Sequence, residues 1–268
     1  MSIVGQGTWN MERDEATQAV RALRRGLDLG MNHIDTAEMY GDGKVERLVA
    51  KAIDGRRGDA FLASKVMPSN ASYRGTLRAC EASLKRLGTD YLDLYLLHWP
   101  GTHPLEETIK AFEELVAEGK IRSYGLSNFD VSGLEEAERI AGLNKIACNQ
   151  VLYHLQERTI ERQVLPWCEE HGVTVVGYSP FYSGRFVLRG ERAKVLGEVA
   201  SSRGTSARQV ALAFLTRRES LFTIPKSSNC DHVAENHQAS EIELSEAELD
   251  QLEKAFPVGR RRSGVPTL

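Results

Sequence analysis

The chain repeats one pattern: a helical segment, then a glycine, then a short apolar run. The glycines of this pattern recur at intervals of 23 to 31 residues, at Gly30, Gly58, Gly88, Gly119, Gly142 and Gly172. Glycine suits the left-handed position just past a helix end, so each of them except Gly58 predicts where a helix stops. This rhythm restricts the chain to folds in which helices and strands alternate.

The apolar runs predict parallel strands that are covered by helices. Six runs follow the glycines ("HIDT", "AFLASKV", "YLDLYLL", "IRSYGLS", "IACNQV" and "VTVVGYS"), and "SIVGQGT" and "LFTIP" bring the number to eight. Apolar residues recur on one helical face in the segments between them, as at Leu105, Ile109, Phe112 and Val116. Eight such units favour a closed α/β barrel, the (β/α)8 TIM barrel, over an open doubly wound sheet. The absence of a GxGxxG after the first run also disfavours the open sheet.

The last third of the chain holds two capping-box patterns, "SARQ" from 206 and "SEAE" from 245. They predict one barrel helix and one supernumerary helix, so we expect a TIM barrel with one or two supernumerary helices. No linker rich in Pro, Gly and Ser interrupts the chain, and residues 1–268 are therefore predicted to form a single domain.

Composition argues against polyanion and membrane partners. The chain has 34 basic and 37 acidic residues, a net charge of −3, and 41% hydrophobic residues. The basic run "GRRRSG" at 259–264 reads either as a nucleic-acid patch or as a solvated tail, and the second reading is the one expected of a short run. Four scattered cysteines, no leader and no membrane-length apolar stretch predict a reduced, cytoplasmic protein. We expect a monomer that binds neither nucleic acid nor a membrane.

Polar side chains stand at the ends of three consecutive predicted strands. Asp35 ends the second, Lys65 the third and His98 the fourth, and Tyr40 follows Asp35 in the adjoining loop. In a TIM barrel the carboxyl ends of the strands form the catalytic rim. The pattern therefore predicts that these four residues meet at one rim.

Each residue also has a structural explanation. Asp35 could cap the next helix, Lys65 could extend to solvent, and Tyr40 and His98 could simply pack in the core. Burial of Lys65 and Asp35 at a crowded rim is costly unless they pair, however, and this favours a functional group. The chemistry indicated is acid catalysis by a phenol: Lys65 would lower the pKa of Tyr40, Asp35 would hold Lys65, and His98 would orient a substrate oxygen.

Seven segments resemble, in order, the successive motifs of the aldo-keto reductases. They are "GMNHIDTAEMYG", "LASKV", "DLYLLHWPG", "GKIRSYGLSNF", "NQVLYH", "GYSP" and "IPKSSNCDHVAEN", and the resemblance runs from Gly5 to about Phe256. It implies NADPH-dependent reduction of aldehydes and ketones by a catalytic tetrad. The matching residues in this chain are Asp35, Tyr40, Lys65 and His98.

The resemblance also implies a nicotinamide site. Ser127, Asn128 and Gln150 match residues that hydrogen-bond the carboxamide, and Tyr178 matches the aromatic residue under the nicotinamide ring. Thr8, at the end of the first predicted strand, belongs to the same expected cofactor surface.

The rest of the cofactor would lie along the last two strand ends. The residues matched to it, from the pyrophosphate to the adenine, are Ser179, Phe181, Lys226, Ser227, Ser228, His232, Glu235 and Asn236. Lys226 and Ser227 match the pair that binds the 2′-phosphate, and a cation with hydroxyls before a helix is an anion site, although a simple helix cap would look similar. This match implies NADPH as cofactor, with NADH possible but weaker. His232 stands where many members carry an arginine, and an imidazole cannot make the same bidentate contact to the phosphate, so we expect a weaker preference for NADPH than is usual.

Two short segments bear on the substrate. The loop after His98 and the tail after Phe256 are short, which leaves Trp9 and Trp99 as expected pocket walls beside an open mouth. The expected substrates are small aldehydes, dicarbonyls or keto-sugars, accepted broadly.

Two other functions are compatible with a barrel of this kind. Lys65 could be the nucleophile of a Schiff-base aldolase, or the chain could be a non-catalytic, NADPH-binding regulatory subunit. The seven histidines show no metal-ligand spacing, so no metal is expected.

Overall fold

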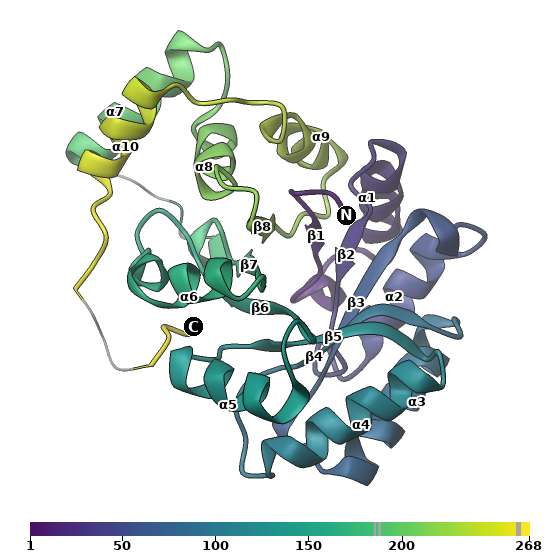
Figure 1. The fold of residues 1–268 in the computed structure, drawn as a ribbon. Coiled ribbons are helices and arrows are strands. Elements are labelled where there is room, and N and C mark those ends of the chain that lie inside the picture. The colour runs from purple at the N-terminus through teal and green to yellow at the C-terminus, as the bar shows by residue number, and fades with distance from the viewer. Residues whose placement is uncertain (185, 187–188, 261–263) are drawn as a thin grey trace.

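The computed structural model describes residues 1–184, 186, 189–260 and 264–268, which form a parallel barrel (Figure 1). Its strands are β1 (Gln6–Gly7), β2 (His33–Asp35), β3 (Phe61–Val66), β4 (Leu92–Leu97), β5 (Ile121–Ser127), β6 (Ile146–Leu152), β7 (Thr174–Tyr178) and β8 (Leu221–Ile224). Neighbours in the sheet follow chain order and are parallel throughout. Parallel bridges from Val4 to Thr223 and from Gly7 to Lys226 join the first strand to the last.

Helices surround the strands, as Figure 1 shows. The described α-helices are α1 (Ala16–Asp28), α2 (Lys44–Ile53), α3 (Tyr73–Leu87), α4 (Leu105–Ala117), α5 (Val131–Ala141), α6 (Val164–Glu170), α7 (Gly190–Ser202), α8 (Ala207–Leu215), α9 (Cys230–Ala239) and α10 (Glu246–Ala255). Short 3₁₀ turns are η1 (Met11–Arg13), η2 (Arg57–Asp59), η3 (Pro68–Asn70), η4 (Thr159–Arg162) and η5 (Tyr182–Gly184). The predicted (β/α)8 TIM barrel is confirmed.

Glycine conformation accounts for the helix ends. Gly88 caps α3 with a φ of 64°, and its N–H bonds to the carbonyl of Leu84. Gly142 likewise follows α5 with a φ of 93°. A side chain at either position would be strained, so these glycines fix where the helix gives way to the next strand.

The barrel interior has an apolar floor and a polar rim. Its buried cluster consists of Ala63, Leu94, Leu96, Cys148, Val176 and Ile224. Because side chains alternate across a strand, the residue two positions further on faces the same interior. Four polar residues stand two positions after members of this cluster, on β3, just after β4, on β6 and on β7. They are Lys65, His98, Gln150 and Tyr178. The alternation therefore aims these side chains at the mouth of the barrel.

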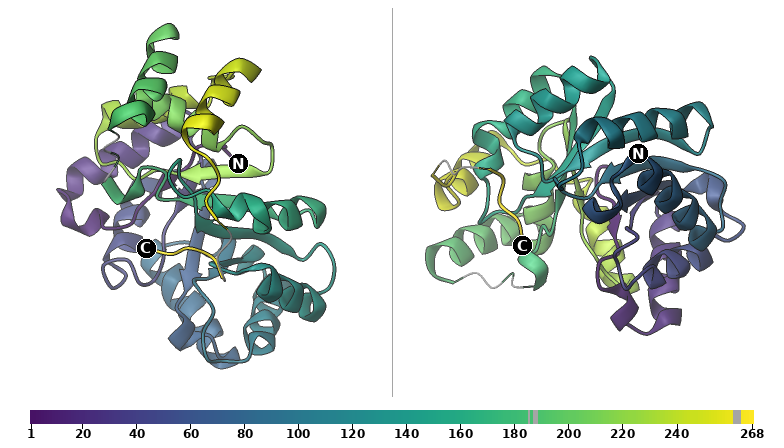
Figure 2. Two further views of the ribbon diagram at one scale, coloured as in Figure 1. Left: turned by 90° about the vertical axis from the view of Figure 1, so that its left-hand side faces the viewer. Right: turned by 90° about the horizontal axis from the view of Figure 1, so that it is seen from below.

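Two helices are supernumerary. α7 and α10 pack against each other and lie away from the barrel axis in Figures 1 and 2. The capping boxes predicted at Ser206 and Ser245 both form, at the starts of α8 and α10. The predictions of a barrel helix at the first and an extra helix at the second are confirmed, and α7 is the second extra helix.

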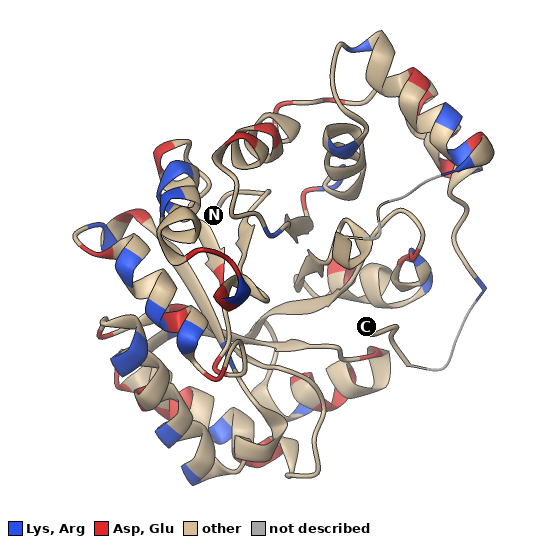
Figure 3. Cartoon of the chain, turned by 180° about the vertical axis from the view of Figure 1, so that it is seen from behind, with Lys and Arg blue, Asp and Glu red and all other residues tan. Residues whose placement is uncertain are grey.

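Charges of both signs alternate on the outer helices, while the strands are almost free of them (Figure 3). Residues 261–263 of the basic run lie outside the described residues. In the part of the chain that the structure describes, no helix is long and apolar enough to cross a membrane. All four cysteines are free thiols, as expected of a reduced protein: Cys80, Cys148 and Cys168 are buried and Cys230 is partly exposed.

Candidate active site

Four side chains meet where β2, β3 and β4 end. The ammonium of Lys65 lies 2.6 Å from Asp35 Oδ1 and donates to the hydroxyl of Tyr40 at 3.2 Å. It also donates to the carbonyl of Thr36 at 2.9 Å. The rings of Tyr40 and His98 are 5.7 Å apart and meet edge to face. The structure thus brings together all four residues predicted to form the rim.

Burial and hydrogen bonding argue against the structural explanations of Lys65, Asp35 and His98. Lys65 is fully buried, so it does not extend to solvent. Asp35 is not a helix cap, because α2 begins after Gly43. His98 is buried, and among the described residues its Nδ1 atom has no hydrogen-bond partner. A buried Lys–Asp pair beside a phenol and an unpartnered imidazole marks this cluster as a candidate functional site.

Burial decides the charge state of the two ring side chains. It raises the pKa of Tyr40, and although Lys65 lowers this pKa as predicted, its effect is smaller than that of burial. Burial also opposes the charge of Lys65, but Asp35 and Tyr40 outweigh it and raise the pKa of Lys65. Burial and the nearby Lys65 lower the pKa of His98 to about 2. At neutral pH the site therefore holds a phenol, an ammonium and a neutral imidazole.

Amide and hydroxyl groups extend this cluster across the barrel mouth. Gln150 donates to Asp35 Oδ2 at 2.8 Å, and Ser127 donates to the carbonyl of Gln150 at 2.8 Å. Asn128 donates to Ser127 at 3.1 Å and accepts from the Tyr178 hydroxyl at 2.9 Å. These residues of β5, β6 and β7 form one connected polar surface beside Asp35.

Three further residues of the expected cofactor surface lie along the same rim. Thr8 donates to the carbonyl of Asp35 at 2.8 Å and lines the mouth of the barrel. Ser179 and Asn128 have φ values of 54° and 63°, a left-handed conformation that is costly for a serine. Strained residues persist where the surrounding structure holds them, and they cluster at functional sites. Phe181 lines the same cavity.

A cavity of about 1480 Å³ opens above these residues. Trp9 and Trp99 both line it, as predicted. Both of the short segments that were expected to leave the mouth open contribute to its wall. They contribute Trp99, Pro100, Gly101, Thr102, His103, Pro104, Leu105, Gly264, Val265, Thr267 and Leu268. The backbone of Leu268 hydrogen-bonds the hydroxyl of Tyr178, so the tail crosses the mouth instead of stopping short of it.

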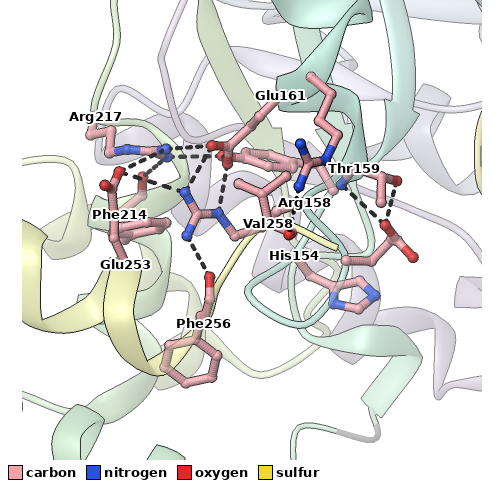
Figure 4. A network of polar contacts seen from close by, with 12 residues as sticks. His154, Arg158, Thr159, Glu161, Phe214, Arg217, Glu253, Phe256 and Val258 are labelled. Carbon is pink, nitrogen blue, oxygen red and sulfur yellow. Dashed lines mark hydrogen bonds and ion pairs between the residues drawn. The ribbon is translucent and has the colours of Figure 1, made fainter. Parts of the chain in front are cut away.

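Two arginines hold the tail where it leaves α10 (Figure 4). The buried Arg158 donates to the carbonyl of Phe256 at 2.5 Å and pairs with both oxygens of Glu161, at 2.7 and 2.8 Å. Arg162 donates to the carbonyls of Val258 and Gly259, at 3.3 and 2.6 Å. The connection between β6 and α6 therefore fixes the direction in which the tail sets out.

A second hollow, of about 350 Å³, adjoins the start of α9. It is lined by Asp14, Glu15, Gln18, Lys226, Ser227, Ser228, Asn229 and His232. Lys226 lines both hollows and so marks the boundary between them. Glu235 and Asn236 lie further along α9 and line neither of these two hollows.

A model of the Aldo/keto reductase family matches residues 3–256. The chain belongs to the aldo/keto reductase family. It is 46% identical over 265 residues to the methylglyoxal reductase YeaE of Escherichia coli (strain K12), which covers 98% of this chain and 93% of that protein. It is 34% identical over 250 residues to the glyoxal reductase of Bacillus subtilis (strain 168), which covers 93% of this chain and 87% of that protein.

Solved aldo/keto reductases share the fold closely. The enzyme from Klebsiella pneumoniae, in complex with NADP and acetate, superposes with a TM-score of 0.95 at 43% identity, covering 100% of this chain and 96% of that one. The thermostable aldo-keto reductase Tm1743, in complex with the inhibitor epalrestat, superposes with a TM-score of 0.90 at 40% identity, covering 95% of each chain.

Arg208 and Asp14 are two of the charged residues that line these hollows without having been predicted to belong to the site. Arg208 lines the main cavity, and its guanidinium lies 4.9 Å from the centre of the Phe181 ring. Asp14 lines the second hollow and contacts Lys226. A helix that follows a barrel strand begins at the catalytic rim, so the position of each residue next to a helix start was the available signal.

Proposed function

We propose that this reductase transfers hydride from NADPH to small aldehydes, ketones and dicarbonyls, with Tyr40 as the proton donor. The observation that carries the proposal is the Tyr40 hydroxyl, which lies 3.2 Å from the buried ammonium of Lys65 in the wall of the main cavity. A phenol held beside a cation can give up its proton, because the cation stabilises the phenolate that remains. Asp35 holds that cation at 2.6 Å.

The cavity fits a nicotinamide cofactor. Asn128, Ser127 and Gln150 offer amide and hydroxyl groups to a carboxamide, beside the ring of Tyr178. Arg208 supplies a cation toward the pyrophosphate, and the boundary with the second hollow offers the Lys226 ammonium to a 2′-phosphate. The Klebsiella relative, crystallised with NADP, supports the same choice of cofactor.

The resident side chains have separate tasks in this proposal. Bound NADPH supplies the hydride, and the protein supplies the proton and the geometry. Tyr40 stays protonated at neutral pH because burial raises its pKa. His98 is neutral, so its imidazole can hydrogen-bond the carbonyl oxygen without competing with Tyr40 as an acid.

The walls of the cavity support small substrates. Trp9 and Trp99 give apolar contact, and the tail closes the mouth from one side. Two relatives, one named methylglyoxal reductase and one glyoxal reductase, support dicarbonyls as the substrate class. Lys226 in the second hollow supports a preference for NADPH, and His232, where many family members carry an arginine, supports a preference weak enough for NADH to be accepted too.

The other functions have less support. A Schiff-base aldolase needs a neutral amine, whereas Lys65 is an ammonium paired with Asp35, and the pKa of Lys65 is raised. A regulatory subunit needs no acid catalyst, whereas the phenol, ammonium and carboxylate are all in place.

The test combines a cofactor assay with a trapping assay. Purified protein is given glyoxal, methylglyoxal, simple aldehydes, ketones and keto-sugars, with NADPH or NADH, and oxidation of the nicotinamide is followed. The proposal predicts faster oxidation with NADPH, and fastest with the dicarbonyls. Turnover without nicotinamide, together with borohydride-dependent covalent labelling of Lys65, would instead establish the aldolase.

A further inference from the structure

Asp14 contacts Lys226, the residue that the proposed function assigns to the cofactor 2′-phosphate, and the neighbouring Ser228. It lies between η1 and α1, and its carboxylate pairs with the ammonium of Lys226. The same oxygen of Asp14 accepts from the hydroxyl of Ser228 at 2.5 Å. The Lys226 ammonium and the Ser228 hydroxyl, which a phosphate oxygen at this position could bind, are thus both bound to one carboxylate oxygen of Asp14.

We propose that Asp14 competes with the 2′-phosphate of NADPH for Lys226 and Ser228, and so sets how strongly this reductase prefers NADPH over NADH. The inference rests on the proposed function, since it takes Lys226 as a 2′-phosphate ligand. It adds a residue that acts against the preferred cofactor. NADH has a hydroxyl in place of this phosphate and leaves the ion pair intact.

The pair is placed so that it can exchange partners. The side chains of Lys226 and Asp14 are 32% and 30% exposed, so either can turn to solvent without leaving a charge buried. Partial burial opposes the charge of Asp14, but Lys226 and Ser228 outweigh it and hold the pKa of Asp14 below its ordinary value. Asp14 is therefore an anion wherever NADPH binds, and its repulsion of the phosphate is present at neutral pH.

The second acidic residue of the hollow does not compete in this way. The carboxylate of Glu15 caps α1 and accepts from the backbone N–H groups of Thr17 and Gln18, at 2.8 and 2.6 Å. Glu15 therefore uses its hydrogen bonds to cap the helix and not to bind Lys226. The competition is thus assigned to Asp14 alone among the described acidic residues that line this hollow.

The test is calorimetric titration of the full chain with NADPH and with NADH. Asp14→Asn keeps the size of the side chain and removes its charge. NADPH binding should tighten about two- to fivefold, the range of an exposed ion pair, and NADH binding should stay the same. The gain should shrink as NaCl is raised, because exposed charges are screened. Asp28→Asn, at the other end of α1, is the matched control, and it should change neither constant.

A parallel Lys226→Ala variant distinguishes a failure of this inference from a failure of the proposed function. Selective loss of NADPH affinity in Lys226→Ala, with no gain in Asp14→Asn, would overturn the competition and leave the cofactor site standing. Weaker NADPH binding in Asp14→Asn would also overturn it, because Asp14 would then be positioning Lys226 for the phosphate. Equal losses of both cofactors in Lys226→Ala would refute the assigned phosphate site itself.

Discussion

Tyr40 and His98 lie beside the same ammonium group, and burial shifts the pKa of each away from neutrality in a useful direction. The pKa of Tyr40 is raised, so the proton donor remains protonated. The pKa of His98 is lowered to about 2, so the imidazole remains neutral. Burial thus leaves Tyr40 as a protonated acid and His98 as a neutral hydrogen-bonding group, and neither titrates near pH 7.

These shifts predict a simple pH profile for carbonyl reduction. The donor must carry its proton, and a raised pKa moves the loss of that proton upward. With saturating NADPH, kcat/KM should be flat from about pH 5 to about pH 9 and fall only above about pH 10, where an ordinary tyrosine titrates. Stopped-flow or steady-state rates across this range measure it. A fall governed by a group titrating between about pH 6 and pH 8 would mean that His98, not Tyr40, supplies the proton.

Single elements then decide how the site is enclosed. The tail begins at Phe256, where α10 ends, and runs on to the wall of the cavity. On the way, Arg158 donates a hydrogen bond to the carbonyl of Phe256 and Arg162 donates one to the carbonyl of Gly259. Arg158 also belongs to a buried ion cluster with Glu161 and Arg217 (Figure 4). Removing Arg158 would leave Glu161 short of a partner and destabilise the chain, so the exposed Arg162 is the better place to test the tail.

Arg162→Ala should raise KM for carbonyl substrates about two- to fivefold and leave the dissociation constant of NADPH unchanged. The reason is that the tail walls would be less well held, and contacts from pocket walls set substrate discrimination. Steady-state kinetics over the substrate panel, with calorimetry for NADPH, measures both effects. Arg218→Ala is the matched control, since Arg218 is exposed and pairs with Glu169 of α6 but does not touch the tail. An unchanged KM in Arg162→Ala would show that the tail keeps its place without this anchor.

The sequence predicts the elements well where local chemistry determines them. Gly88 and Gly142 end helices because their backbone conformation excludes other residues, and the capping boxes at Ser206 and Ser245 start helices by local hydrogen bonds. Val116 was expected on the same helical face as Phe112 and is 38% exposed, because the buried face of α4 ends with Leu115 and leaves Val116 at its edge.

The rest depends on contacts between distant parts of the chain. The four rim residues could be predicted because strand ends share one rim, whereas Asp14 and Lys226 meet across 212 positions of sequence without a common motif. The path of the tail was also missed, since its length does not reveal that Arg158 and Arg162 direct it over the mouth. Burial, which sets the sign of the pKa shift of Tyr40, is likewise a property of the folded molecule.

At the scale of the whole molecule, buried histidines make stability depend on pH. Burial lowers the pKa of His33 and of His154 to about 4, and that of His98 to about 2, from an ordinary value of 6.5. Between about pH 6.5 and pH 4 the unfolded chain binds protons at these sites and the folded chain does not. The contribution of these neutral histidines to the free energy of unfolding is therefore fully present above pH 6.5. As pH falls below that value, the free energy of unfolding decreases by about 1.4 kcal/mol per pH unit for each histidine.

Chemical denaturation at pH 7, 6, 5 and 4.5 measures this slope. His33→Leu removes a fully buried imidazole whose ring nitrogens have no partner among the described residues, so it should flatten the slope by about one histidine. His103→Leu, at an exposed position, should leave the slope as in the parent. Identical slopes in His33→Leu and the parent would mean that His33 is protonated in the folded protein.

The central claim is that Tyr40 donates the proton in an NADPH-dependent carbonyl reduction, and the most direct measurement is the kcat of Tyr40→Phe with a dicarbonyl substrate. The loss of a general acid predicts a fall of about 10²–10⁴-fold, with the NADPH dissociation constant nearly unchanged. Tyr95→Phe is the control, because Tyr95 is a buried tyrosine whose hydroxyl has no partner among the described residues, and it should keep its activity. A kcat of Tyr40→Phe within a few-fold of the parent would contradict the account.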